Sequence, residues 1–325
     1  MKNKRILITG GAGFIGSNLC EKLLHFENEI ICLDNLSTGN LNNISDMLNH
    51  SKFTFIEGDV RNLDICQEAA HGVDFVLHQA ALGSVPRSIK DPITSNSVNV
   101  EGFLNMLVAS RDQKVKRFIY AASSSTYGDS KSMPKIEHTI GKPLSPYAIT
   151  KYVNELYADI FSTTYGLETI GLRYFNVFGK KQDPDGPYAA VIPKFIIQLI
   201  NGESPIINGD GSYSRDFTYV ENVVQANILS LKVDNDKAIN NVYNVAYGQK
   251  NSLNTLVSYI KNFLTKFDSN ISKIKVLHGP IRKGDIPHSH ANIDKAKKLL
   301  GYNPKFSLEE GLKEAINWYW NKFKK

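Results

Sequence analysis

The chain has 325 residues, a length that predicts one large domain or two of ordinary size, and its 42% apolar content is sufficient for a substantial core. No stretch approaches the ~20 consecutive apolar residues of a membrane span, and the modest charge of +6 includes no basic run interleaved with aromatics. We therefore expect neither a membrane nor a nucleic-acid partner. The three scattered cysteines, Cys20, Cys32 and Cys66, fit reduced thiols in a cytoplasmic protein.

Six short apolar runs alternate with amphipathic segments through the first half of the chain. The runs are 5–9, 29–33, 53–56, 74–77, 117–121 and 169–172. Between them, segments such as 100–108 and 152–160 repeat their apolar residues with helical periodicity. This alternation predicts an α/β fold with a doubly wound parallel sheet, whose functional groups gather at the carboxyl ends of the strands.

Three glycines, Gly10, Gly13 and Gly16, lie between the first predicted strand and the helix that follows it. Glycines there let the backbone approach a pyrophosphate, and the helix N-terminus offers free N–H groups. Asp34 ends the second strand, where a carboxylate accepts hydrogen bonds from the 2′-hydroxyl of an adenosine ribose and repels a 2′-phosphate. The pattern predicts a Rossmann domain and favours NAD over NADP. Asp59 falls where an adenine edge would lie, but a strand-end turn explains it equally well.

Tyr147 and Lys151 are four residues apart in a predicted helix, so both side chains emerge from one face, about one turn apart. A neighbouring cation favours the phenolate of a tyrosine, whose ordinary pKa is about 10. A Tyr-x-x-x-Lys pattern by itself is common, and a lysine that caps the ring or reaches water also explains it.

After about residue 180 the regular alternation of strands and helices is lost. We expect residues 1–180 to form the NAD-binding Rossmann domain and residues 181–325 a smaller α/β substrate-binding domain. The two domains are expected to be partly interleaved, with a return of the chain to the first near 216–246.

Together these features resemble the extended short-chain dehydrogenases/reductases, through the glycine triplet, Asp34, Gly58-Asp59-Val60, the serine cluster 123–125 and Tyr147-x-x-x-Lys151. Three longer motifs, at 80–88, 173–179 and 209–217, are similar to those of nucleotide-sugar 4-epimerases of the UDP-hexose 4-epimerase family. The nearest subgroup resembles the UDP-N-acetylglucosamine 4-epimerases and the enzymes that act on the corresponding uronic acids. The resemblance covers the whole chain.

The resemblance implies an enzyme that keeps NAD bound and interconverts UDP-GlcNAc and UDP-GalNAc. Tyr147 would take the proton from the sugar O4 while C4 passes hydride to the nicotinamide, and the 4-keto sugar would turn over before the hydride returns. Lys151 would bind the nicotinamide ribose and, with the cationic ring, lower the Tyr147 pKa. A serine would hydrogen-bond O4 and relay its proton. Ser124 is favoured for this role, while Ser123 and Ser125 stay open.

The resemblance also implies which further residues contact each ligand. The cofactor-binding set would be Gly10, Gly13, Phe14, Ile15, Gly16, Asp34, Asn35, Asp59, Val60, Gln79, Ala80, Ala81, Asn99 and Tyr174, with Tyr147 and Lys151. The substrate-binding set would be Gly83, Ser84, Ser124, Asn176, Gln182, Ala190, Arg215, Arg282, Asp285 and Ser289. Within it, the arginines would bind the diphosphate and Asp285 the uridine ribose.

In the family that the chain resembles, Ser289 favours the N-acetylated UDP-GlcNAc and UDP-GalNAc over UDP-Glc and UDP-Gal. Galactose-type epimerases often carry Tyr at the matching position, where a ring crowds a 2-acetamido group and a serine leaves room. The alternatives are that Ser289 is an ordinary loop residue and that the substrate is a UDP-hexuronic acid or UDP-glucose.

Other reactions of the same scaffold need residues that are absent here. A 4,6-dehydratase usually has an Asp-Glu pair directly after the strand-five hydroxyl, and a UDP-glucuronate decarboxylase a Glu, but segment 124–127 contains no acid. A reductase that exchanges its cofactor, or a non-catalytic NAD or nucleotide-sugar sensor, stays an alternative. A sensor, however, would usually have lost Tyr147 or Lys151.

Two further expectations concern metals and assembly. His288 and His290 lack a matched cluster of Cys, His or carboxylate ligands, so we expect no metal. As in the family that the chain resembles, helical patterns at 100–112 and 148–164 predict a homodimer through a four-helix interface. An intramolecular role for their apolar positions is the alternative.

Overall fold

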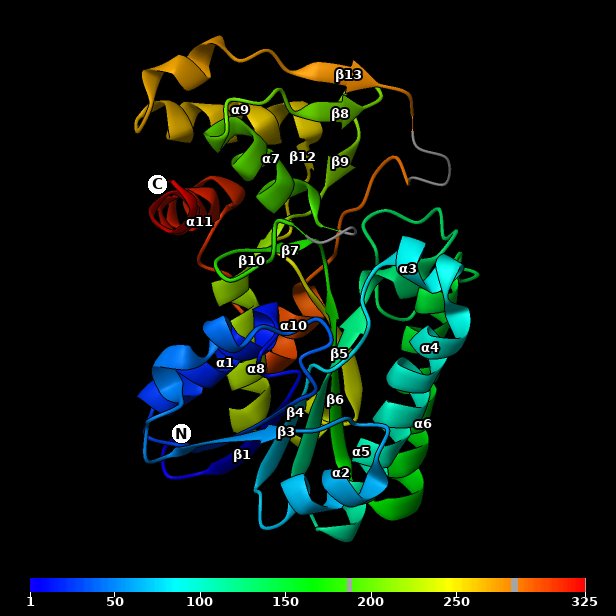
Figure 1. Cartoon of the computed structure of the whole chain (residues 1–325). Helices are drawn as coiled ribbons and strands as arrows, with labels where there is room; N and C mark the ends of the chain where they lie inside the picture. The colour runs from blue at the N-terminus through cyan, green and yellow to red at the C-terminus, as the bar shows by residue number, and fades with distance from the viewer. Residues whose placement is uncertain (186–188, 282–285, 325) are drawn as a thin grey trace.

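The structure is a computed structural model that describes residues 1–185, 189–281 and 286–324 (Figure 1). Within these residues the central element is a seven-stranded sheet with the order β11-β6-β5-β4-β1-β2-β3, and every pair of neighbours is parallel. Its strands are β1 (Arg5–Thr9), β2 (Glu29–Asp34), β3 (Phe53–Glu57), β4 (Phe75–His78), β5 (Arg117–Ser123), β6 (Glu168–Tyr174) and β11 (Asn241–Val245). The predicted α/β class and the doubly wound parallel sheet are confirmed.

Each face of the sheet is covered by a hydrophobic core and a layer of helices (Figure 1). Ile6 and Ile8 of β1 belong to one core and Leu7 to the other, because successive side chains of a strand point to opposite faces. Burial on both faces explains why the strands are continuous apolar runs. One layer contains α1 (Phe14–His25), α8 (Val220–Lys232) and α10 (Asp294–Leu300), and the other α2 (Leu63–Ala70), α5 (Gly102–Asp112) and α6 (Pro146–Tyr165). The short helices α3 (Val85–Lys90) and α4 (Pro92–Asn96) pack against α6.

A third core lies beyond the carboxyl edge of the sheet, in the upper part of Figure 1. It is formed mainly by α7 (Val191–Ile200), α9 (Leu253–Thr265) and α11 (Leu308–Phe323). Three two-stranded pairs accompany them: β7 (Val177–Phe178) with β10 (Thr218–Tyr219), β9 (Ser214–Arg215) with β12 (Asn251–Ser252), and β8 (Ile206–Asn208) with β13 (Leu277–Gly279). None of the helices in the described ranges is long and apolar enough to cross a membrane.

The chain passes between these two regions more often than the expected division at residue 181 suggests. β11 returns to the large sheet beside β6. Residues 291–302 also pack into a core of that sheet, through Ala291, Ile293 and Tyr302 among others. The Tyr302 hydroxyl donates to Ala246 O at 3.0 Å, which holds this late segment against the end of β11.

Asp216, between β9 and β10, forms hydrogen bonds with three segments that lie where the chain passes between the two regions. Its carboxylate accepts hydrogen bonds from Gly248 N and Ala291 N, each at 3.2 Å, and its backbone carbonyl accepts one from Asn176 Nδ2 at 3.0 Å. The side chain is fully buried. Burial raises the Asp216 pKa from the usual 3.8 to about 6, against the opposing effect of the backbone hydrogen bonds.

This raised pKa makes a testable contribution to stability. Between about pH 4 and pH 6 the folded chain holds more protons at Asp216 than the unfolded chain, so stability falls as the pH rises through that window and is constant above it. The Asp216→Asn variant lacks this contribution. We expect the free energy of unfolding of the wild type, minus that of the variant, to fall by about 3 kcal/mol across the window in urea titrations. A difference that does not change with pH would contradict the buried, titrating carboxyl.

Candidate active site

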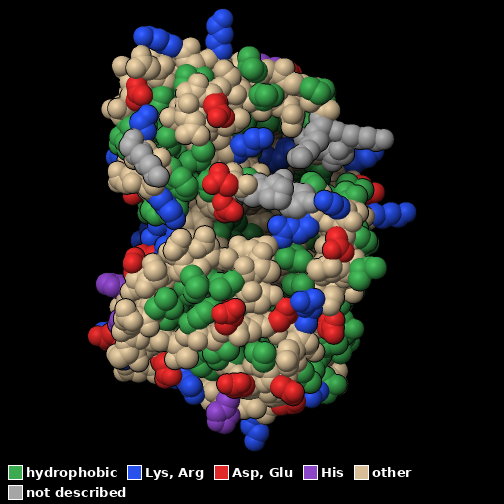
Figure 2. Space-filling model, viewed as in Figure 1, with side chains coloured by type: hydrophobic (Ala, Val, Ile, Leu, Met, Phe, Trp, Pro, Cys, Tyr) green, Lys and Arg blue, Asp and Glu red, His purple; other side chains and the backbone are tan. Residues whose placement is uncertain are grey.

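A cavity of about 430 Å³ opens at the carboxyl ends of the central strands. Its walls come from the glycine loop, the end of β2, the segment after β4, the end of β5 and the start of α6. Figure 2 shows a hollow between the lower and upper parts of the molecule, with Lys and Arg side chains beside it. The parallel sheet therefore brings segments far apart in sequence to one site.

The glycine loop leaves no room for side chains. Gly10 has φ +66°, and a Cβ there would lie 2.7 Å from Ala80 N. A Cβ on Gly16 would lie 2.1 Å from Gly10 O. Gly13 precedes α1 and provides no side-chain cap, so the first N–H groups of the helix stay available to a ligand. All three glycines, Phe14 and Ile15 line the cavity, which fits a pyrophosphate at the helix N-terminus.

Asp34 is fixed by its neighbours. Oδ2 accepts from Ala12 N at 2.9 Å and Oδ1 from Leu36 N at 2.8 Å. Burial raises the pKa of this carboxyl, and the two backbone hydrogen bonds act in the opposite direction. Because each carboxylate oxygen can accept further bonds, Asp34 is suited to bind the hydroxyls of a ribose, and it lines the cavity.

Most other predicted cofactor residues also line the cavity, namely Asn35, Val60, Gln79, Ala80, Ala81 and Tyr174. Two do not, because their polar groups are used elsewhere. Asp59 pairs with Arg61 at 2.6 Å, and that hydrogen bond lowers its pKa to about 2. The buried Asn99 amide bonds Leu82 N, Leu82 O and Thr150 Oγ1. Ser37 and Thr38 line the cavity although the sequence analysis missed them, and their place shortly after Asp34 was the available signal.

Tyr147 is positioned by the start of α6. Ser145 caps the helix by accepting from Ala148 N at 3.1 Å, and Tyr147 N donates to the buried Ser88 Oγ at 3.0 Å. Lys151 follows one turn later, and its Nζ donates to Ala121 O at 2.8 Å. Tyr147 and Lys151 both line the cavity, as their spacing predicts.

The pKa values of Tyr147 and Lys151 are shifted mainly by burial, and not by the attraction between the two groups. Burial raises the Tyr147 pKa, and a hydrogen bond with Ser123 opposes the rise. Burial also lowers the Lys151 pKa to about 8, against the influence of Glu155. Lys151 Nζ lies 6.0 Å from the centre of the Tyr147 ring and is bonded to a carbonyl. The expected lowering of the Tyr147 pKa by Lys151 is therefore not produced by the protein alone, where desolvation is the larger effect.

Ser123, rather than the favoured Ser124, meets Tyr147. β5 extends to Ser123, two residues beyond the predicted strand end, so Ser123 points to the same side as Ala121 and lines the cavity with it. Its Oγ accepts from Ser125 N at 3.1 Å and Ser125 Oγ at 2.9 Å, which leaves its own proton free to be donated. Ser124 begins a 3₁₀ turn and is not among the described lining residues. The geometry favours Ser123, one of the two serines that the sequence left open, and the catalytic role of Ser124 stays a prediction.

A second cavity, of about 250 Å³, continues from the first, since Asn176 and Val177 line both. Its walls are largely apolar, with polar groups from Asn176, Asn208 and Arg215. Such a pocket fits a planar base with a charged group at its edge. Among the expected substrate residues, Asn176, Ala190 and Arg215 line this cavity, and Gly83 lines the first.

The remaining expected substrate residues lie outside both cavity walls or outside the described structure. Ser84 caps α3 by accepting from Arg87 N at 3.3 Å, and Gln182 Nε2 donates to Val177 O at 3.3 Å. Ser289 N donates to Ser214 O at 3.0 Å, which places Ser289 beside β9 and next to Arg215. Arg282 and Asp285 lie outside the described residues.

The two histidines near Ser289 have local partners. His288 Nδ1 lies 2.9 Å from Ser214 Oγ, and His290 Nε2 lies 3.1 Å from Gly248 O. In the ranges that the structure describes, no three His, Cys, Asp or Glu side chains gather as metal ligands.

The NAD dependent epimerase/dehydratase family matches residues 6–246, and the chain belongs to this family. The family resemblance, the enzyme prediction and the NAD prediction are thereby confirmed, and the glycine loop and Asp34 provide the fitting site. The chain is similar to a UDP-N-acetylglucosamine 4-epimerase from Methanobrevibacter ruminantium, solved in complex with UDP-N-acetylmuramic acid. The two are 40% identical with a TM-score of 0.93, over 99% of this chain and 100% of that one.

The names of two further relatives specify other sugars. A UDP-glucose 4-epimerase from Thermotoga maritima, solved with UDP-glucose, is 37% identical with a TM-score of 0.89, over 98% of this chain and 99% of that one. A UDP-glucuronate 4-epimerase of Thermodesulfobacterium geofontis is 33% identical over 96% of this chain and 95% of that protein. The names of the relatives therefore agree on the reaction at C4 but not on the sugar.

Adjacent serines provide a matched test of the proton relay. We expect Ser123→Ala to lower kcat by about 10²- to 10³-fold, as loss of a positioned proton-transfer group does, and Ser124→Ala to change it by less than about threefold. Steady-state kinetics of both variants with the same sugar nucleotide measure this. Equal losses, or a larger loss in Ser124→Ala, would return the role to Ser124.

Proposed function

We propose that this enzyme is a UDP-sugar 4-epimerase that interconverts UDP-GlcNAc and UDP-GalNAc. The observation that carries the proposal is the wall shared by the two cavities, formed by Asn176 and Val177. A nucleotide held in the apolar cavity near Arg215 extends its sugar past this wall toward Ser123 and Tyr147. The 4-epimerase names of the relatives support the reaction.

The side chains suit reversible oxidation at one carbon. Held by the glycine loop and Asp34, NAD would supply a reversible hydride acceptor for C4 of the sugar, and its cationic ring would add positive charge near Tyr147. Tyr147 takes the proton from O4, directly or through Ser123, and returns it to the 4-keto sugar. Lys151, one turn along α6, provides an ammonium in the same cavity for the ribose hydroxyls of the cofactor.

Elimination and decarboxylation are less well supported. The turn after Ser123 is Ser124-Ser125-Thr126-Tyr127, and it contains no carboxylate. Thr126 and Tyr127 are buried, and the Tyr127 hydroxyl donates to Asn244 Oδ1 at 2.6 Å, so this turn is held in place. Without an acid here, the 4-keto sugar has no group from this turn to promote loss of water.

An N-acetylated sugar is favoured by Ser289 and by the relative that acts on UDP-N-acetylglucosamine. Ser289 is tied by its backbone to β9, directly beside Arg215, and its side chain is small. A tyrosine at this point would add a ring next to the substrate-side arginine. UDP-glucose and the UDP-hexuronic acids are the alternative substrates, as the names of the other two relatives indicate.

A panel of sugar nucleotides tests the substrate. The protein is incubated separately with UDP-GlcNAc, UDP-Glc, UDP-GlcNAcA and UDP-GlcA, and the C4 epimers are resolved by NMR. We expect the highest kcat/KM for UDP-GlcNAc, and we expect Ser289→Tyr to lower this value by about tenfold more than the value for UDP-Glc, since the ring crowds the acetamido group. Equal losses on both sugars would remove Ser289 as the determinant, and a preference for UDP-Glc or an acid would overturn the proposed substrate.

We also propose a homodimer through α5 and α6. Leu156 and Ile160 of α6 are about half-exposed, at 50% and 54%, which excludes the intramolecular core as the explanation for these two residues. They lie four apart on one face of the helix, and Leu104 and Val108 of α5 are half-buried at the same spacing. Covering such a stripe with a second copy would remove apolar surface from water.

Light scattering tests the dimer. We expect Ile160→Glu to shift the protein to monomers, because a carboxylate would then be buried without a partner in the interface. Ser258→Glu, on the exposed side of α9, adds the same single negative charge away from α6 and is expected to leave the mass unchanged. A dimer that persists in Ile160→Glu would place the interface elsewhere.

A further inference from the structure

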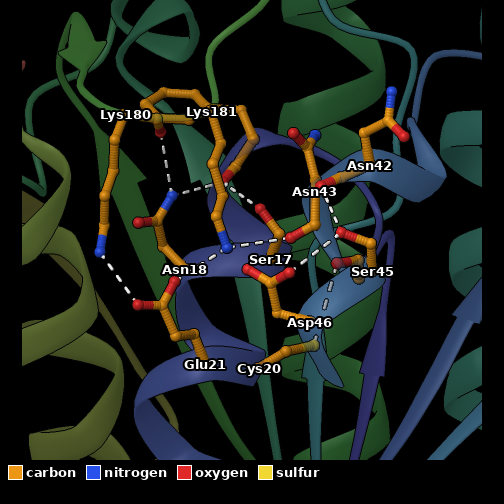
Figure 3. A network of polar contacts seen from close by, with 12 residues as sticks. Ser17, Asn18, Cys20, Glu21, Asn42, Asn43, Ser45, Asp46, Lys180 and Lys181 are labelled. Carbon is orange, nitrogen blue, oxygen red and sulfur yellow. Dashed lines mark hydrogen bonds and ion pairs between the residues drawn. The ribbon is translucent and has the colours of Figure 1, made fainter. Parts of the chain in front are cut away.

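Two lysines behind the active site join the substrate side of the molecule to the cofactor side. Lys180 and Lys181 follow β7, whose Val177 lines both cavities. From there they reach back to α1 and to the segment that contains Asn43 (Figure 3). Both side chains approach Glu21 of α1.

Lys181 makes the closer and more buried set of contacts. Its Nζ lies 2.8 Å from Glu21 Oε2 and donates to Asn43 O at 2.9 Å. Lys180 Nζ lies 3.2 Å from Glu21 Oε1 and 3.9 Å from Glu221 Oε1, with no bond to the Asn43 segment among the described contacts. The Lys181 side chain is 17% exposed and that of Lys180 26%. Lys181 therefore links α1 with the Asn43 segment, whereas Lys180 links α1 with α8.

The Asn43 segment leads directly to the cofactor site. Asn43 Nδ2 donates to Ala12 O at 3.0 Å, and Asn40 N donates to the same carbonyl at 3.0 Å. Ala12 N in turn donates to Asp34 Oδ2 at 2.9 Å. A short chain of hydrogen bonds thus connects Lys181 with the glycine loop and with the carboxylate suited to the adenosine ribose.

α1 is held by the same stretch of chain. Asn18 Nδ2 donates to Lys180 O at 3.2 Å and to Phe14 O at 2.8 Å, and Phe14 lines the cofactor cavity. The stretch 180–181 therefore contacts α1 at Asn18, which also bonds Phe14 of the first turn, and at Glu21 (Figure 3).

The backbone at Lys181 is in an unfavourable conformation. Its φ is +68°, in the left-handed region of backbone conformation, which residues other than Gly, Asn and Asp rarely adopt. Such a conformation persists only where surrounding contacts fix it, and here those contacts are Glu21 and Asn43. The Glu21 carboxyl is affected as well. Burial would raise its pKa, but the hydrogen bond and charge of Lys181 lower it below the usual value.

We propose that Lys181 is a positioning residue that retains NAD, by holding the glycine loop, the Asn43 segment and the substrate side of the molecule in one arrangement. The inference rests on the proposed epimerase reaction, which returns the hydride and has no need to release its cofactor. The substrate, however, must enter and leave at every turnover past Asn176 and Val177. Lys181 keeps the cofactor side closed while the substrate side exchanges its ligand.

The direct test is the rate at which NAD leaves the holoenzyme in the absence of any sugar nucleotide. Holoenzyme is diluted into buffer with an NAD-hydrolysing enzyme as trap, and the NAD still bound is extracted and counted over time. We expect Lys181→Met to release NAD about tenfold faster, as loss of charge-assisted hydrogen bonds predicts, and Lys181→Arg to stay within about twofold. Lys180→Met removes the same charge without the Asn43 bond, and its release is expected to change by less than about threefold.

Lys181→Gly separates retention from folding. Glycine adopts the left-handed conformation without strain, so this variant is expected to melt no lower than Lys181→Met and yet to lose NAD as fast. With saturating NAD in the assay, both variants should regain the activity that release of the cofactor had removed.

Three outcomes would overturn the inference. The first is that Lys181→Met releases NAD at the wild-type rate. The second is that Lys180→Met releases NAD as fast as Lys181→Met, and the third is that Lys181→Gly retains NAD as well as the wild type. The release measurement uses no sugar substrate, so a wrong assignment of the sugar would leave its result intact.

Discussion

The hydrogen bond from Asn176 Nδ2 to Asp216 O is the contact on which the arrangement of the two cavities depends. Asn176 follows β6 with φ +37°, and it turns the chain away from the sheet at the place where both cavities meet. Asp216 is itself held by the N–H groups of Gly248 and Ala291, so three segments converge behind this bond. In the reaction that we propose, this junction sets where the sugar nucleotide lies relative to Tyr147.

The electrostatics of the site make the cofactor part of the catalytic machinery. Burial alone raises the Tyr147 pKa and lowers that of Lys151 to about 8, so at neutral pH the phenol stays protonated while the lysine is still largely cationic. A cationic nicotinamide ring held in the cavity that Tyr147 lines would favour the phenolate. An enzyme built in this way is inactive whenever its cofactor is lost. We propose that the connection from Lys181 through Asn43 and Ala12 to Asp34 keeps the cofactor bound.

Short sequence patterns correctly predicted the features that depend on residues close together in the chain. The glycine loop, Asp34 and the Tyr147–Lys151 pair depend on spacing within one strand-turn-helix or one helical turn, and the structure places them as expected. Ser123 stayed open but was not favoured, because the end of β5 was predicted two residues early, and an end that shifts also changes which side chain points into the cavity. The contact of Lys181 with Glu21 joins residues far apart in sequence, and no periodicity encodes it.

The most direct test of the central claim follows the hydrogen on C4 of the sugar. UDP-GlcNAc that carries deuterium at C4 is incubated with the holoenzyme in ordinary water, and the product is isolated and examined by NMR and mass spectrometry. The account predicts UDP-GalNAc that keeps its deuterium at C4, since the hydrogen leaves that carbon and returns to it without exchange with solvent. Loss of the label to water during epimerisation, or no C4 epimer at all, would contradict it.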